Sequence, residues 1–294
     1  MHIFIDESGT FASAPGKRNS VSAVGALIVP DHSMKGFEKL YGRLRTRLPK
    51  TKGEVKGKTL EERQIAELAG ILRKVGAILE IVTIDMATHP EQAILKHKAS
   101  QEEAITASLT SEHHPNAVHE VWRLRSELEA MSAQLYVQSV VMGELVYHSL
   151  NHAGVYFSLR TASELGEYHW VIDAKERRKT TPWEKWWQTV ILPMLESKTF
   201  RTPFLSIKEG DYRWRERFRT TLSDYKRQFV SNPNNGEIFD LRPVMQEDFR
   251  FSPEPELGLE AVDIVTNAVR RAMSGNLSRA GWIELPKLMI HRKE

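Results

Sequence analysis

The chain of 294 residues contains no cysteine, which excludes disulfide bonds, thiolate metal sites and a cysteine nucleophile. No apolar run approaches the ~18 residues that a membrane helix needs, so we expect no membrane partner. The first ten residues lack the basic and apolar regions of a secretory signal, and we expect them to belong to the fold. These absences predict a cytoplasmic protein.

Several catalytic motifs are missing as well. The sequence has no Gly-x-Ser-x-Gly, no Gly-x-x-x-x-Gly-Lys-Ser/Thr phosphate loop and no Gly-x-Gly-x-x-Gly. Their absence argues against a serine hydrolase, a P-loop enzyme and a dinucleotide-dependent oxidoreductase. The composition, 41% apolar and 27% charged with a net charge of +3, is that of a globular protein and is compatible with a polyanionic partner.

An acidic residue directly follows the first apolar run. His2-Ile3-Phe4-Ile5 predicts a buried strand, which ends at Asp6 and is followed by Glu7-Ser8-Gly9. A carboxylate is costly to bury, and the glycine permits a tight turn that exposes it. Asp6 is therefore either a turn former or a site residue. A second apolar run, Tyr168 to Ile172, also ends in an acid, Asp173.

The remaining apolar patterns predict an α/β fold. A segment of mixed helical spacing is longer than a sheet connection needs, and we expect residues 87–165 to form a helical insertion within a single domain. We expect strands at 21–29, 78–84, 168–173 and near 241–245, and helices at 33–44, 61–74, 116–151, 183–195, 212–229 and 256–273.

The last of these helices carries a narrow polar stripe. Its polar residues recur at intervals of three and four, with apolar residues on both flanks. Such a stripe either faces solvent or forms one wall of a site, and its acidic centre favours the wall. The stripe consists of Glu256, Glu260, Asp263, Asn267 and Arg270.

Asp6, Asp173 and Asp263 thus lie on three separate elements that could meet. If they converge within ~4 Å, each pair repels by about 4 kcal/mol at an effective dielectric of ~20. Such a cluster must hold protons or bind a cation. Oxygen ligands without histidine or cysteine favour Mg²⁺ or Mn²⁺, and two ions sharing an aspartate suit phosphodiester hydrolysis.

These motifs resemble a bacterial family. Phe4-Ile5-Asp6-Glu7-Ser8-Gly9, the strand ending at Asp173, and Gly258-Leu259-Glu260-Ala261-Val262-Asp263 are similar to domain-of-unknown-function family 3800. Its members open on IDESG, close on a helix with an LQLAD-like core, and are placed in the ribonuclease H-like superfamily. The resemblance covers roughly residues 1–85 and 165–275.

The resemblance implies a mixed five-stranded sheet of order 3-2-1-4-5, with metal-binding acids at Asp6, Asp173 and Asp263. Glu7 and Glu260 are expected to support them in catalysis, although Glu7 would point away from Asp6 in an extended strand. A further acid that ribonuclease H takes from its first helix has no clear counterpart. Glu54, Glu144 and Glu260 are all open as the fourth ligand.

Basic residues flank the expected site and suggest contacts with phosphate groups. Ser8, Lys56, Lys175 and Arg177 are candidate substrate contacts, whereas solvated surface is the alternative for the lysines. The arginines at 213, 215, 217 and 219 are expected on a solvated helix flank, and Trp183, Trp186 and Trp187 in the core or a subunit contact.

Two hypotheses follow from the sequence. The first is a divalent-metal-dependent nuclease of ribonuclease H-like fold that binds nucleic acid. The second is a catalytically inactive ribonuclease H-like module of a larger, defence-related complex. In either case the helical insertion offers a surface for a second copy of the chain or another protein. Whether the three aspartates meet distinguishes the hypotheses.

Overall fold

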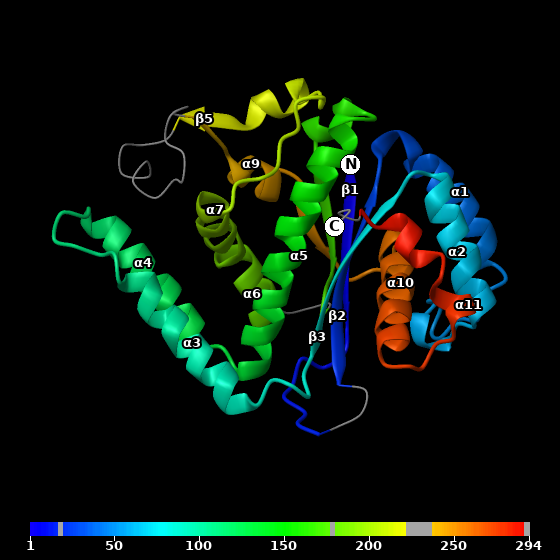
Figure 1. The fold of residues 1–294 in the computed structure, drawn as a ribbon, viewed down its shortest axis with the longest axis horizontal. Helices are drawn as coiled ribbons and strands as arrows, with labels where there is room; N and C mark the ends of the chain where they lie inside the picture. Colours follow the sequence, from blue (N-terminus) through cyan, green and yellow to red (C-terminus); the bar gives the residue numbers. More distant parts are fainter. Residues whose placement is uncertain (17–19, 177–179, 222–236, 291–294) are drawn as a thin grey trace.

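A mixed five-stranded sheet lies between two layers of helices (Figure 1). The computed structural model describes residues 1–16, 20–176, 180–221 and 237–290. The strand order is β3-β2-β1-β4-β7, where β1 pairs antiparallel with β2 and parallel with β4. The strands are β1 (His2–Ser8), β2 (Val21–Val29), β3 (Ile78–Asp85), β4 (His169–Asp173) and β7 (Phe249–Ser252). The expected α/β class and mixed five-stranded sheet are confirmed.

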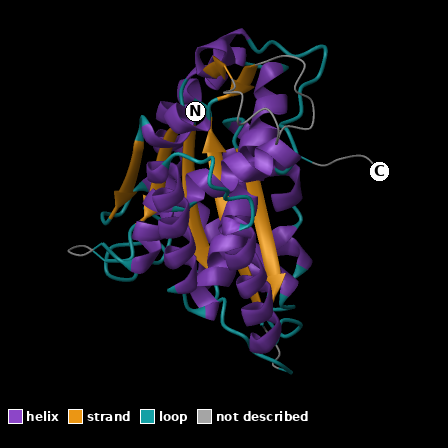
Figure 2. Cartoon of the chain, turned by 90° about the vertical axis from the view of Figure 1, so that its left-hand side faces the viewer, coloured by secondary structure: helices purple, strands orange, loops and turns teal. Residues whose placement is uncertain are grey.

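Alternating side chains of the central strands divide the core into two halves. Phe4 and Val171 lie in the first half, under α10 (Leu257–Met273). Ile5 and Trp170 lie in the second half, under α5 (Ala133–Ser158). Successive side chains of a strand point to opposite faces of the sheet, so the apolar residues of each central strand contribute alternately to the two halves of the core. Figure 2 shows the strands enclosed by these helical layers.

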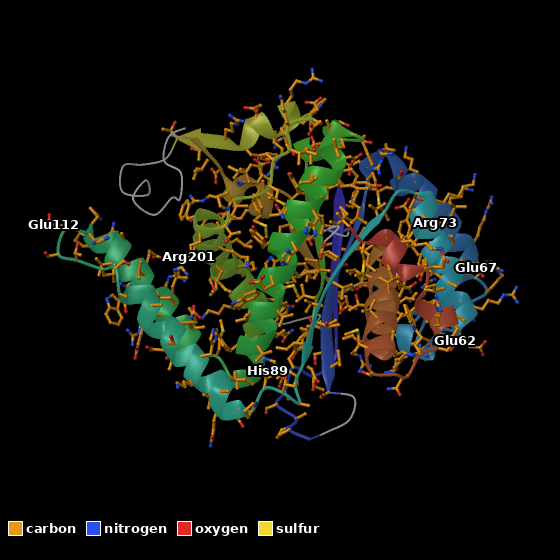
Figure 3. The ribbon with its side chains drawn as sticks, in the orientation of Figure 1. Glu62, Glu67, Arg73, His89, Glu112 and Arg201 are labelled. Carbon is orange, nitrogen blue, oxygen red and sulfur yellow. The ribbon has the colours of Figure 1, made fainter. Side chains whose placement is uncertain are left out.

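The first half is completed by helices from both ends of the chain. These are α1 (Met34–Arg45), α2 (Glu62–Lys74) and α11 (Arg279–Trp282), with the short 3-10 helices η1 (Asp31–Ser33), η2 (Gly57–Thr59) and η6 (Leu285–Leu288). Charged side chains cover the outer surface of α2, where Glu62, Glu67 and Arg73 are labelled in Figure 3. Because the outer face of α2 is polar and its inner face is buried, the apolar residues of this segment recur at helical spacing in the sequence.

The second half includes α6 (Pro182–Thr189) and α7 (Ile191–Arg201), and the three tryptophans of α6 are buried, as expected. Further elements on this side are η3 (Ala162–Gly166), η4 (Arg213–Phe218), α9 (Leu241–Gln246) and a small sheet of β5 (Arg219–Thr221) and β6 (Glu237–Phe239). No helix in the described ranges is long and apolar enough to cross a membrane.

Only part of the segment 87–165 projects from the sheet. The antiparallel pair α3 (Glu91–Thr106) and α4 (Pro115–Glu129) extends away from the body, with Glu112 near its tip (Figures 1 and 3). In contrast, α5 packs on β2 and β3 and is buried along most of its length. The long helix expected at 116–151 is therefore two helices, separated where Ser132 caps α5 by accepting a hydrogen bond from the Leu135 amide.

Three other expectations were wrong. The strand expected near 241–245 is the helix α9, because Asp240 caps its first turn and Pro243 fits there. The fifth strand is instead β7. Of the helix expected at 212–229, the first part is η4 followed by β5, and residues 222–229 lie outside the described ranges. Arg215 is buried, with its guanidinium 4.3 Å from the ring centre of Phe239, and so is not a solvated flank residue.

Candidate functional site

Asp6 and Asp173 end the two central parallel strands side by side. Ile5 pairs with Ile172, so the next step in the same register places Asp6 beside Asp173. Phe4 and Val171 pack in the first half of the core, under α10. Asp6 comes two residues after Phe4, and Asp173 two residues after Val171, so both acids point to the α10 face. Neighbouring strands are about 4.8 Å apart, and the two carboxyl groups therefore share one end of the sheet.

Glycines allow α10 to bring Asp263 to the same place. Gly25 lies opposite Asp6, and a Cβ atom there would be 2.0 Å from Thr266 Oγ1 on α10. A Cβ atom on Gly258 would be 2.3 Å from the Phe4 ring. The helix thus rests directly on the sheet beside Asp6, and Asp263 lies about one helical turn before Thr266.

The loop before α2 closes over Asp263. The Gly57 amide donates a hydrogen bond to Asp263 Oδ2 at 2.8 Å. A Cβ atom on Gly57 would lie 2.8 Å from the Ile264 Cα atom, so only glycine allows this approach. The contact fixes one carboxylate oxygen and leaves Oδ1 available.

The three aspartates lie within electrostatic range of one another. The pKa of Asp6 is well above its usual value, because of burial and then the charges of Asp263, Asp173 and Glu7. Burial also raises the pKa of Asp173 and of Asp263. The fold therefore gathers acids whose ionised forms it disfavours, as is typical of functional sites.

The spacing of the acids limits how a metal could be held. Among the described residues, no three of these carboxylates offer oxygens that all lie within 4.8 Å of one another. Ligands of a single Mg²⁺ ion at ~2.1 Å are separated by about 3 to 4 Å, so these three do not form one shell in this arrangement. One or two of these acids, completed by water and substrate oxygens, would match the ligand set that Mg²⁺ commonly uses.

Two lysines lie among the acids. Lys175 forms an ion pair with Glu7, which points to the opposite face from Asp6 as its strand position requires. Burial opposes the charge of Lys175, but Glu7, Asp6 and Asp173 raise its pKa. Lys56 pairs with Glu54 at 2.6 Å. Both lysines therefore remain protonated and offset part of the negative charge.

A cavity of about 450 Å³ opens beside Asp263. Buried Asn267 donates a hydrogen bond to Ser8, while its Oδ1 atom has no hydrogen-bond partner in the described part of the chain. The unpaired oxygen provides a further polar group at this wall. The cavity is lined by Thr51, Lys52, Glu54, Lys56, Lys58, Asp263 and Asn267.

The structure separates the candidates for the fourth acid. The charge of Glu54 raises the pKa of both Asp173 and Asp263, so it lies at the site. Glu144 is on α5, at the other face of the sheet, and pairs with Lys198 at 2.5 Å. Proximity therefore favours Glu54 over Glu144.

Glu260 is engaged in a buried network one turn before Asp263. Its oxygens accept two hydrogen bonds from Arg45, each 2.6 Å long, and others from Tyr41 and the Val55 amide at 3.2 Å. A bidentate arginine pair of this kind ties α1 to α10. These contacts favour a positioning role over the catalytic role expected for Glu260.

Ser8 is also occupied by protein contacts. It is buried, and its Oγ atom accepts hydrogen bonds from Arg270 Nε at 2.8 Å and from Asn267. The expected substrate contact of Ser8 would require these bonds to open. Arg177, another expected substrate contact, lies outside the described residues. Sequence reasoning missed the Gly57 amide and the cavity-lining role of Asn267, although Asn267 belongs to the polar stripe of the last long helix.

Comparison with family models, with curated proteins and with solved structures found no match. The resemblance to domain-of-unknown-function family 3800, and with it the ribonuclease H-like assignment, stays a prediction.

Proposed function

We propose that the protein is a divalent-metal-dependent nuclease with a ribonuclease H-like arrangement of acids. The observation that supports this is the placement of Asp6, Asp173 and Asp263 at one end of two parallel strands, where burial and mutual repulsion raise the pKa of Asp6. A cation would offset this repulsion, and an all-oxygen donor set favours Mg²⁺ or Mn²⁺.

Each residue of the acidic site has its own role in this proposal. Asp6, Asp173 and Asp263 would hold the metal, and Asp6 is the acid whose pKa is raised by the charges of both of the others. The Gly57 amide holds the Asp263 carboxylate in place. Bound ions of this kind activate water and stabilise the leaving oxygen in phosphodiester hydrolysis. Glu54 lies near enough to Asp173 and Asp263 to assist as the further acid.

Nucleic acid is the substrate class that the surroundings favour. Lys52, Lys56 and Lys58 line the cavity beside Asp263, and Lys175 lies next to Asp6 and Asp173. Lysines at such positions contact phosphate oxygens and orient a strand without reading its bases. A backbone bound along the cavity would have a phosphate next to the acids.

A second candidate is a binding module that keeps this arrangement without catalysis. The wide spacing of the carboxylate oxygens and the pairing of Lys175 with Glu7 favour it. In that case the lysines would hold a phosphate backbone while the acids remain protonated or paired.

Cleavage assays with purified protein distinguish the two candidates. Single- and double-stranded RNA, DNA and hybrid duplexes are incubated with Mn²⁺ or with a chelator. We expect Mn²⁺-dependent cleavage that Asp6→Asn reduces at least 100-fold, whereas Asp211→Asn, a matched change at an exposed surface pair, has no effect. Cleavage in chelator, or cleavage that survives Asp6→Asn, contradicts the nuclease. Nucleic-acid binding by folded protein without cleavage supports the module.

A further inference from the structure

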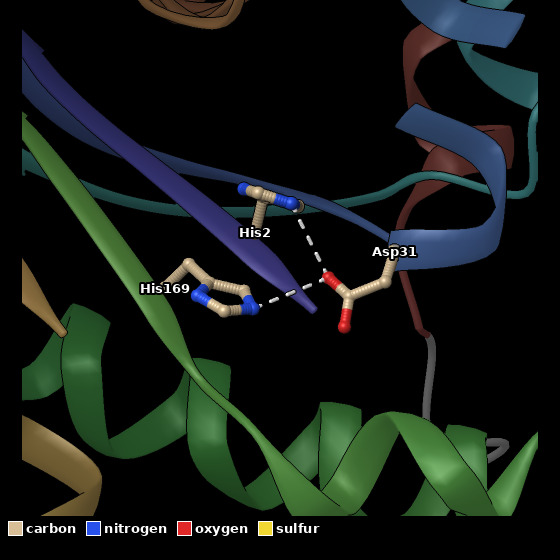
Figure 4. A group of neighbouring side chains, drawn as sticks. All are labelled: His2, Asp31 and His169. Atoms are coloured by element: carbon tan, nitrogen blue, oxygen red, sulfur yellow. Dashed lines mark ion pairs between the residues drawn. The ribbon is translucent and has the colours of Figure 1, made fainter. Parts of the chain in front are cut away.

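The opposite end of the same two strands carries a different group of side chains. His2 on β1 pairs in register with His169 on β4, four residues before Asp6 and Asp173 respectively. Four residues of strand span about 13 Å, so this group is separate from the acidic site although it lies on the same sheet face. Asp31 reaches it from η1, directly after β2 (Figure 4).

The three side chains converge on one point. Asp31 Oδ1 lies 3.3 Å from His2 Nε2 and 3.7 Å from His169 Nε2, and both rings face that single oxygen (Figure 4). One ligand atom from each residue lies within 4.8 Å of the other two. Ligands around a tetrahedral Zn²⁺ ion, at about 2.0 to 2.1 Å from the metal, are separated by about 3.4 Å. The two distances to Asp31 Oδ1 are close to this separation, and the three ligand atoms are near enough to share one metal ion.

Outer contacts orient the ligands. His169 Nδ1 lies 2.5 Å from Asp248 Oδ2, which leaves Nε2 directed toward Asp31. Metal-binding histidines commonly make such a bond from their second nitrogen to a carboxylate. Asp31 is held in turn, because its amide donates to buried Glu164 at 2.8 Å and its Oδ2 pairs with the Met1 amino group at 3.0 Å. Asp31 Oδ1 is thereby left for the two imidazoles.

We propose that His2, Asp31 and His169 form a binding site for a divalent transition metal ion of the zinc class. Two imidazole nitrogens with one carboxylate favour such an ion over Mg²⁺, in contrast to the all-oxygen acidic site. The three side chains are 25 to 39% exposed, so water can complete the coordination. The ion would link the start of β1, the start of β4 and the segment after β2.

Zinc binding is measured in the Asp6→Asn background, which removes a proposed ligand of the acidic site. Untagged, chelator-treated protein is titrated with Zn²⁺ by calorimetry and by thermal unfolding. We expect one equivalent to bind and to raise the Tm. His169→Gln and Asp31→Asn should each abolish this binding, whereas His119→Gln, at an exposed position on α4, should bind as the parent does.

Two further measurements keep the test decisive if a ligand variant unfolds. Asp248→Asn retains all three ligands and should weaken Zn²⁺ binding by about 10- to 100-fold, as loss of an outer carboxylate contact does. Co²⁺ in place of Zn²⁺ should give the strong visible absorption of a low-coordinate nitrogen-containing site, absent in His169→Gln. Absence of a bound equivalent in the Asp6→Asn protein, or equal binding by His169→Gln and His119→Gln, overturns the proposal.

Discussion

Asp6 shows how burial of a carboxylate among other acids costs stability. Its pKa in the fold is raised by burial and by neighbouring acids, above the ordinary aspartate value of 3.8. The native state therefore holds its proton more tightly than the unfolded chain does. Stability from this residue is lost as the pH rises from the unfolded pKa through the folded pKa, and it stays lost at higher pH.

We therefore expect Asp6→Asn to be more stable than the parent in chelator at pH 7 to 8, with the difference vanishing as the pH falls towards 4. Urea unfolding across this pH range measures it. Asp211→Asn is the control, because the hydrogen bonds from Arg213 lower the pKa of Asp211 to about 2 and its charge is not opposed by the fold. A parent that is more stable than Asp6→Asn at neutral pH would show that Asp6 makes a structural bond instead.

The ion pair between Arg45 and Glu260 allows a second test at the scale of residues. The test asks whether Glu260 has a buried structural role. Removing Arg45 leaves the Glu260 carboxylate buried without its main partner. Arg45→Met should then cost about 3 to 5 kcal/mol of unfolding free energy. Arg47→Met, which breaks an exposed pair with Glu67, should cost no more than about 1 kcal/mol. Equal losses in chemical denaturation would contradict a buried structural role for Glu260.

At the scale of elements, the approach of α10 to the sheet depends on glycine. A methyl group at Gly258 would meet the Phe4 ring, so Gly258→Ala should destabilise the protein by about 1 to 3 kcal/mol through overpacking. Gly36→Ala in α1 is the matched change, since nothing lies within 4 Å of the added atom, and it should stabilise by up to about 1 kcal/mol. Calorimetric melting of the two variants measures both effects. If Gly258→Ala leaves the free energy of unfolding unchanged, α10 can shift to make room for the methyl group.

The elements that the sequence predicted well are those with strong local patterns. The apolar runs of β1, β2, β3 and β4 and the striped helix α10 were located to within a few residues. The strand β7 was missed because its sequence, Phe-Arg-Phe-Ser, is short and joins the sheet only through β4. The helix α9 was mistaken for a strand because one apolar turn of helix and one short strand have similar composition, and its capping residue was the overlooked signal.

At the scale of the whole molecule, the sequence supplied the three aspartates but not their surroundings. The end positions of β1 and β4 made the meeting of Asp6 and Asp173 predictable. In contrast, Arg45 binds Glu260 from 215 residues away, and the Gly57 amide reaches Asp263 across 206 residues. Nothing in the local spacing around either partner encodes such contacts, which depend on how α1, η2 and α10 pack together within one helical layer.

The central position of β1 also has a consequence for synthesis. On one side, its partner β2 begins at Val21, soon after β1 ends at Ser8. On the other side, the Met1 amino group donates to the Glu167 carbonyl, 166 residues later in the chain. While the ribosome makes the intervening residues, one edge of β1 stays unpaired and open to strands of other nascent chains. On this edge of β1, Asp6 follows directly after Ile5, the last residue that pairs with β4, and charged residues at such positions discourage edge-to-edge pairing. We therefore expect the charge of Asp6, proposed above as a metal ligand, also to disfavour aggregation of the unfinished chain.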